Sequence, residues 1–285
     1  MSIADPKHPL PDLADLLRFY ADAGVDEALF DEPVDRFEES AATTARAQAP
    51  QQNEPARSRE TKAQPPQAQA QARPAPAMAV PDEAQAARAR ELAREAKSLE
   101  ELREIVSAFD GCNLKFTAKQ TVFSDGNPQA DLMLVGEAPG RDEDIEGLPF
   151  VGRSGRLLDR MLAAIGIDRT SAYIANVIPW RPPGNRTPTP LETEICRPFI
   201  ERQIELAAPK VLVTLGGPSA KVLLHATEGV LRLRGKWKTH ATASGIEIAA
   251  MPTLHPAYLL RNPAHKKLAW RDLLEVNAKL EVLRG

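Results

Sequence analysis

The chain has 285 residues, a formal net charge of -3 and a hydrophobic fraction of 43%. This charge argues against a strongly basic protein that coats nucleic acid, although an acidic chain can still carry one basic face. Two cysteines are too few for a disulfide framework or a zinc site, and no apolar run is long enough to cross a membrane. The N-terminus lacks a basic region followed by an apolar core, so we expect a cytoplasmic protein.

Three segments of different composition follow one another along the chain. Residues 1–40 contain a short amphipathic stretch at 10–37, which either folds back on the rest of the chain or docks on a partner protein. Residues 41–87 are rich in Ala, Gln, Pro and Arg and contain no Trp, Tyr, Phe, Ile or Leu, so we expect a disordered linker. Residues 88–285 are then expected to form one ordinary domain with a sizeable core.

Apolar strands alternate with helices in this last segment. The expected strands are 132–135, 172–178, 210–215 and 246–251. The expected helices lie around 157–165, from 189 to about 208, from 220 to 224, and from about 265 onward. Pro198 is expected to kink or divide the second of them. Such alternation predicts an α/β fold of three layers, in which helices flank a central, four-stranded, mostly parallel sheet.

The most distinctive segment is residues 136–155, in which glycines, prolines, acidic residues and one phenylalanine lie between a strand and a helix. The segment follows the carboxyl end of a strand, where open α/β sheets bind their ligands. It contains neither G-x-G-x-x-G nor Gly-Lys-Ser/Thr, which argues against a dinucleotide site or a P-loop. We therefore predict a loop that binds some other ligand.

Distinctive side chains follow three of the predicted strands. Glu137 and Glu143 follow the first strand, Asn176 lies at the end of the second, and His255 follows the fourth, while Phe150 adds a flat apolar surface. An asparagine can both donate and accept on one edge of a planar heterocycle, and a phenylalanine can stack on its face. Taken singly, Asn176 could be a turn or cap residue, and His255 could bond a backbone carbonyl. Their convergence at one edge of one sheet favours a pocket for a base.

These positions carry motifs that resemble those of the uracil-DNA glycosylases, specifically family 4, the bacterial and archaeal iron-sulfur type. The resemblance covers roughly Cys112 to Asn277 in unbroken order. Its motifs are GEAPG at 136–140, GLPFVGR at 147–153, Asn176 with RPPGNR at 181–186, Pro209-Lys210 with Leu215-Gly216, and His255-Pro-Ala257. The resemblance implies the fold of that superfamily and a monofunctional DNA N-glycosylase of base excision repair. Such an enzyme flips deoxyuridine out of DNA, hydrolyses the N-glycosidic bond, releases uracil and leaves an abasic site.

The resemblance also implies roles for single residues. Glu137 matches the glutamate that positions or activates the attacking water, and the backbone at Ala138 matches a contact to the base. Phe150 matches the ring that stacks on uracil, Asn176 the amide that reads its edge, and His255 the donor to uracil O2. A carboxylate on the sugar side and a donor on the base side would together lower the barrier to bond cleavage.

Further residues are expected to line the pocket or to contact DNA. Glu143 falls where the family has an acid near the pocket, and is expected to help bind uracil. A leucine can wedge into the gap that a flipped base leaves, and an arginine can hold phosphate. The DNA contacts are expected from Arg186, Tyr258, Leu259, Leu260 and Arg261.

The cysteine pattern departs from that of the family, whose cluster uses four cysteines. Cys112 and Cys196 match the second and fourth, whereas Phe109 and Trp180 stand at the first and third positions. Neither aromatic side chain can ligate iron, and two thiolates cannot build a four-cysteine site. We therefore predict that the chain has no cofactor, and that Phe109 and Trp180 fill the vacated volume.

Two alternatives to a uracil-releasing enzyme stay open from the sequence. The first is a non-catalytic relative that binds DNA and recruits repair partners through residues 10–37, and the second is a glycosylase for another deaminated base such as hypoxanthine. The expected partner is DNA that contains uracil, and the chain is expected to act as a monomer.

Overall fold

The computed structural model describes residues 83–284. The expectations for residues 1–40, including the amphipathic stretch at 10–37, lie outside these residues, as does most of the linker expected at 41–87. Helix α3 (Glu83–Glu95) begins inside that expected linker. The last five residues of the expected linker, 83–87, are therefore helical. The reason is an alanine face that includes Ala86 and Ala89, which is buried in a core shared with α8 (Pro190–Ala207).

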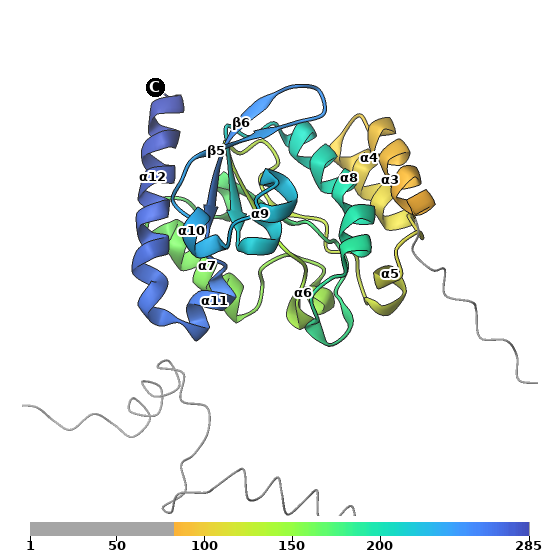
Figure 1. Ribbon diagram of the computed structural model, residues 1–285, viewed down its shortest axis with the longest axis horizontal. Coiled ribbons are helices and arrows are strands. Elements are labelled where there is room, and N and C mark those ends of the chain that lie inside the picture. The colour runs from red at the N-terminus through yellow and green to blue at the C-terminus, as the bar shows by residue number, and fades with distance from the viewer. Residues whose placement is uncertain (1–82, 285) are drawn as a thin grey trace, which may run out of the picture. The chain divides into compact units, whose positions relative to one another are not determined.

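A six-stranded sheet forms the centre of the described part (Figure 1). Its strands, in spatial order, are β1 (Asp125–Gly126), β3 (Ala172–Asn176), β2 (Leu132–Gly136), β4 (Val211–Leu215), β6 (Glu247–Thr253) and β5 (Lys238–Ala241). The four inner strands are parallel and are the four that the sequence predicts. The predicted strand number was wrong, because β1 and β5 each add an antiparallel edge strand.

Helices cover both faces of this sheet and make three layers (Figure 1). One face packs on α3, α4 (Leu99–Ala108), α8 and α9 (Gly217–Leu224), through strand residues such as Met133 and Leu212. The other packs on α7 (Arg153–Ala163) and α12 (Lys266–Arg284), through residues such as Leu134 and Val213. Both faces of the inner strands are therefore buried, which explains why these strands read as continuous apolar runs.

The remaining helices are short. They are α5 (Leu114–Thr117), α6 (Arg141–Glu146), α10 (Val230–Leu233), α11 (Pro256–Arg261), and the 3-10 turns η1 (Arg169–Ser171), η2 (Pro183–Asn185) and η3 (Pro263–His265). Helix α6 lies within the segment 136–155 that the sequence presents as a loop. Helix α8 begins with the predicted capping box and runs through Pro198 without a division. From residue 83 to residue 284, no helix has the length and apolar character that a membrane span requires.

Candidate active site

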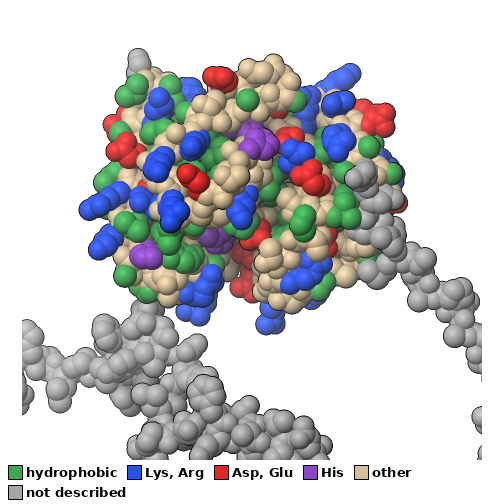
Figure 2. Space-filling model, viewed as in Figure 1, with side chains coloured by type: hydrophobic (Ala, Val, Ile, Leu, Met, Phe, Trp, Pro, Cys, Tyr) green, Lys and Arg blue, Asp and Glu red, His purple; other side chains and the backbone are tan. Residues whose placement is uncertain are grey.

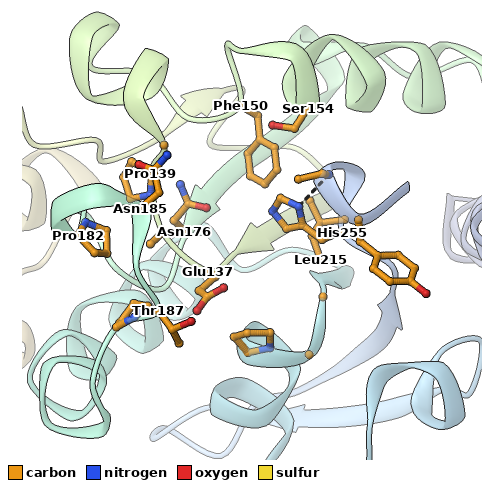
Figure 3. Close-up of a pocket in the computed structure, with 18 of the residues that line it drawn as sticks. Glu137, Pro139, Phe150, Ser154, Asn176, Pro182, Asn185, Thr187, Leu215 and His255 are labelled. Carbon is orange, nitrogen blue, oxygen red and sulfur yellow. Dashed lines mark hydrogen bonds between the residues drawn. The ribbon is translucent and has the colours of Figure 1, made fainter. Parts of the chain in front are cut away.

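A cavity of about 520 Å³ opens at the carboxyl edge of the parallel strands (Figure 3). The segments after β2, β3, β4 and β6 line it, since the carboxyl ends of parallel strands meet at one edge of a sheet. All six residues expected to act in catalysis or to bind uracil lie in its wall. They are Glu137, Ala138, Glu143, Phe150, Asn176 and His255.

Phe150 is held in an unusual backbone conformation. Its φ is +56°, a left-handed value that non-glycine residues seldom adopt. The Arg169 guanidinium donates hydrogen bonds to the carbonyl oxygens of Pro149, at 3.1 Å, and of Phe150. Gly155 allows α7 to pack closely against the Phe150 backbone, because a Cβ at position 155 would lie 1.7 Å from the Phe150 carbonyl oxygen. The ring is thus fixed against the cavity, with its centroid 5.4 Å from that of His255 and the two planes at 30°.

Asn176 presents a buried amide at the end of β3. The residue is 5% exposed, and its Oδ1 has no hydrogen-bond partner among residues 83–284. Gly136 on the neighbouring strand makes the space, because a Cβ there would lie 2.4 Å from this oxygen and 2.6 Å from Phe150 Cζ. Figure 3 shows the amide and the Phe150 ring pointing into a shared space. A buried acceptor without a partner is costly, and here it is available to a ligand.

His255 is the N-cap of α11, and this position sets its tautomer. Its Nδ1 accepts a hydrogen bond from the Ala257 N–H at 3.1 Å, so the proton of the neutral ring lies on Nε2. Burial, with a smaller contribution from the Arg261 charge, lowers the pKa of His255 to about 4. The imidazole is therefore neutral at pH 7 and can offer one N–H to a ligand.

Glu137 directly follows β2 and its side chain is half-buried. No hydrogen bond or ion pair to its carboxylate occurs within the described range 83–284. Burial raises the pKa of this carboxyl above its ordinary value. An unpaired, partly desolvated carboxylate beside the pocket can stabilise a positive charge or orient a water molecule.

Glu143 reaches the same wall but its carboxylate serves the loop itself. One oxygen accepts from the N–H of Gly140 at 3.0 Å, and the other from the N–H groups of Val151 and Gly152 at 3.2 Å each. These bonds tie the start of α6 to the start of α7, with Phe150 between them. We therefore assign Glu143 a role in positioning the pocket loop.

The residues expected to contact DNA divide into two groups. Tyr258 and Arg261 line the cavity mouth, and Leu260 is partly exposed. Leu259 is 1% exposed and packs with Leu254 and Ala269. Its expected role at the DNA surface was wrong, because α11 turns this side chain into the core.

Arg186 lines the cavity, and its guanidinium already forms an ion pair. Its guanidinium makes a two-pronged ion pair with Glu192, at 2.9 and 2.7 Å. Glu192 also accepts from the Thr189 N–H at 2.7 Å, within the capping box of α8. A contact from Arg186 to phosphate has to be made together with this ion pair, so Arg186 also holds the loop after β3.

Reasoning from the sequence missed the roles of two residues at the site, Arg169 and Asn185. Arg169 contacts the Phe150 backbone from 19 residues away in the chain, and nothing local to its position signals that role. Asn185 lies in the motif at 181–186 and has a left-handed φ of +55°, which asparagine tolerates better than most residues. Its Oδ1 accepts from Arg181 Nε at 2.7 Å. The Gly-Asn pair was the available signal for this turn.

The two cysteines lie in the core and do not line the cavity; Cys196 is on the buried face of α8. Cys112 and Cys196 are both fully buried, and their sulfur atoms are 4.0 Å apart. Burial raises the pKa of the Cys196 thiol, so that it stays protonated and donates to Cys112 Sγ. Within residues 83–284, no group of three or more His, Cys, Asp or Glu side chains could hold a metal ion. The residues present do not fit an iron-sulfur cluster.

Comparison with known proteins places the chain in a family. Residues 123–274, more than half of the chain, match the family described as the uracil DNA glycosylase superfamily. A type-4 uracil-DNA glycosylase of Sulfurisphaera tokodaii is 39% identical over 63% of this chain and 83% of its own length. Those of Archaeoglobus fulgidus and Thermotoga maritima are 40% and 39% identical, over 85% and 88% of their lengths and 59% of this chain in each case. The chain therefore belongs to the uracil-DNA glycosylase superfamily.

Proposed function

We propose that this chain is a monofunctional uracil-DNA glycosylase that hydrolyses the N-glycosidic bond of a flipped deoxyuridine. The observation that carries the proposal is the buried Oδ1 of Asn176, which has no partner in residues 83–284 and lines a cavity with the Phe150 ring and the His255 Nε2 proton. Type-4 uracil-DNA glycosylases at 37–40% identity support it.

The Asn176 amide has the polarity that uracil requires. Uracil presents an N3–H donor beside an O4 acceptor, so the amide oxygen can accept the first while the amide NH₂ donates to the second. Cytosine carries an unprotonated N3 and an amino group at these positions, and would leave the Asn176 oxygen facing a lone pair. Phe150 would stack on the base and hold its edge toward the amide.

His255 would act on the departing base. Cleavage of the N-glycosidic bond leaves negative charge on uracil, and a neutral Nε2–H aimed at O2 stabilises that charge as it develops. The low pKa keeps the imidazole neutral, so it acts as a hydrogen-bond donor and does not protonate the base. The bond from the Ala257 N–H fixes the ring for this task before substrate arrives.

Glu137 would act on the sugar. The transition state carries positive charge on the anomeric carbon, and a carboxylate nearby stabilises it and orients the water that attacks. The base and the sugar are thus served by different strand ends, His255 after β6 and Glu137 after β2.

DNA would be gripped at the cavity mouth. We assign Arg261 and Arg186 to phosphate, and Leu260 with Tyr258 to the gap left by the flipped nucleotide. On the face seen in Figure 2, lysine and arginine side chains are interspersed with acidic ones, so we assign the attraction for DNA to the two arginines of the cavity. A cytoplasmic location, a monomeric state and a protein partner for residues 10–37 stay predictions.

Single-turnover release from oligonucleotides that contain uracil, hypoxanthine or xanthine tests the proposal. We expect uracil release by the full chain and a loss of about 100-fold or more in Asn176→Ala and His255→Ala, since each removes a contact made at the base. The matched control is Asn277→Ala, a substitution on the exposed face of α12. Tight DNA binding without release of any base would refute the enzyme and favour the non-catalytic alternative.

A further inference from the structure

We propose that Phe109 and Trp180 form an aromatic brace that positions both loops of the base pocket, in place of an iron-sulfur cluster. The proposal rests on the proposed function for the meaning of the pocket, and on packing and hydrogen bonds for the brace itself. Trp180 and Phe109 are thereby assigned as positioning residues, since neither lines the cavity.

The brace is a compact set of rings in the core. Phe109 is 2% exposed and Trp180 is 1% exposed. Their rings stack with centroids 6.5 Å apart and planes at 21°, and Phe109 also meets the Phe199 ring edge-on at 5.1 Å. Such aromatic pairs stabilise a core beyond the area they bury.

The rings occupy the place where two of four cluster ligands would stand. Gly111 confirms how tightly Phe109 fills this place, because a Cβ on Gly111 would lie 2.5 Å from Phe109 Cζ. The remaining sulfur atoms, of Cys112 and Cys196, belong to free thiols 4.0 Å apart, and Cys196 donates a hydrogen bond to Cys112. Volume and ligand number both exclude a four-cysteine cluster from this core.

Trp180 connects the brace to the first pocket loop, residues 181–188. Residues 183–187 of this loop are exposed, and the ion pair of Arg186 with Glu192 anchors its far end, so its start depends on Trp180 and the buried Pro182. Trp180 immediately precedes it, and the indole Nε1–H donates to Thr121 Oγ1 at 3.1 Å. The Val122 N–H donates to the carbonyl of Pro179, the residue before Trp180, at 2.8 Å. The segment 119–122 thus holds the start of the loop at two points.

The same segment reaches the second pocket loop through α6. The N–H groups of Lys119 and Gln120 donate to Asp144 Oδ1 at 2.7 and 3.3 Å. Asp144 is 3% exposed, and its other oxygen lies 3.9 Å from the Arg181 guanidinium. Asp144 directly follows Glu143, whose carboxylate ties the loop around Phe150. A continuous set of contacts therefore links the indole to both walls of the pocket.

Trp180→Phe and Thr121→Val test this connection, because they remove the donor and the acceptor of one hydrogen bond. Thr121→Val keeps the side-chain volume, whereas Trp180→Phe also removes part of the buried indole. We expect uracil release to lose about three- to tenfold in kcat/KM in each variant, from the loss of one buried hydrogen bond. The double variant should lose no more than Trp180→Phe alone, since the hydrogen bond is already gone in that variant. Trp270→Phe, at an exposed position on α12, is the matched control and should not change kcat/KM.

Hydrogen exchange supplies a readout that does not depend on activity. Amides in residues 138–152 and 181–188 should exchange faster in both variants and stay unchanged in the control. Unchanged exchange together with unchanged kcat/KM would refute the brace. A wild-type chain that releases no uracil would refute the proposed function, and the exchange data would still decide on the brace.

Iron content tests the replacement of the cluster. The wild-type full chain, purified without oxygen, should contain no stoichiometric iron and show no visible absorption. The variant Phe109→Cys/Trp180→Cys presents four thiols, and should take up iron and sulfide to give an absorbing species. About four iron atoms per wild-type chain would overturn the proposal, and so would a double variant that binds no iron yet keeps wild-type exchange and kcat/KM.

Discussion

The low pKa of His255 makes the stability of the protein depend on pH in a calculable way. The folded ring has a pKa of about 4, against 6.5 for an ordinary histidine, so the folded state takes up this proton less readily than the unfolded state. Stability from this group is complete above pH 6.5 and is lost as the pH falls from 6.5 toward 4. A shift of about 2.5 units at ~1.4 kcal/mol each corresponds to about 3 kcal/mol at pH 4.

Replacement of His255 by Asn isolates this effect. Asparagine does not titrate and can still cap α11 by accepting from the Ala257 N–H. Urea unfolding of the wild type and the variant, at steps from pH 7 to pH 4, gives the free energy of unfolding of each. We expect the wild type to lose about 3 kcal/mol more than the variant over this range, with almost all of the difference below pH 6.5.

Arg261 provides a second measurement on the same ring. Its charge is the smaller of the two causes of the shift, so Arg261→Gln should raise the pKa of His255 and make the loss on acidification less steep. Equal pH dependence in the wild type and in His255→Asn would refute the reasoning. It would mean that the ring titrates normally, and that it could protonate the base near neutral pH.

Three further predictions follow from the site. Glu137 has a raised pKa, so kcat should fall as the pH drops through that value, and Glu137→Gln should lower kcat by about 100-fold and flatten this acid limb of the rate profile. Gly136→Ala should lower uracil affinity in a binding titration and cost about 1–3 kcal/mol in thermal unfolding, since the new Cβ meets Asn176 and Phe150; an unchanged affinity would contradict the proposed pocket. Leu259→Ala should destabilise the fold by about 2–5 kcal/mol, whereas Leu260→Ala should mainly reduce kcat/KM on duplex DNA; the reverse result would contradict the inward orientation of Leu259.

The inner sheet could be predicted from the sequence and its edges could not. The four parallel strands are apolar on both faces, which makes each a continuous run between loop signals. Strand β1 has two residues, and the exposed residues of β5 outnumber the one that is buried, so neither carries a hydrophobic pattern. Helix α6 is a six-residue, mostly charged stretch, and it forms because the loop around it supplies its partners.

The site could be predicted where a polar side chain lies at the carboxyl end of a predicted strand. Asn176 and His255 are polar residues at the carboxyl ends of buried strands, and the cavity brings them together as expected. The direction of a side chain on a short helix could not be predicted in this way, because Leu259 and Leu260 are the same type of residue. Only the packing of α11 against the core separates them. Arg169 depends on contacts between distant segments, which no local pattern encodes.

The pocket wall combines a strained aromatic residue with an unpaired polar group, and both would meet the bound base. Phe150 is held at a left-handed φ and Asn176 carries a buried oxygen without a partner in residues 83–284, and each is unfavourable by about 1–3 kcal/mol. Arg169 holds the Phe150 conformation through a hydrogen bond to its carbonyl, and Gly136 leaves the space beside the Asn176 oxygen. A base that stacks on the ring and donates its N3–H relieves the cost at Asn176, whereas a base without that proton does not. With the Asn176 amide oriented as in this structure, the relief at its oxygen favours uracil over cytosine.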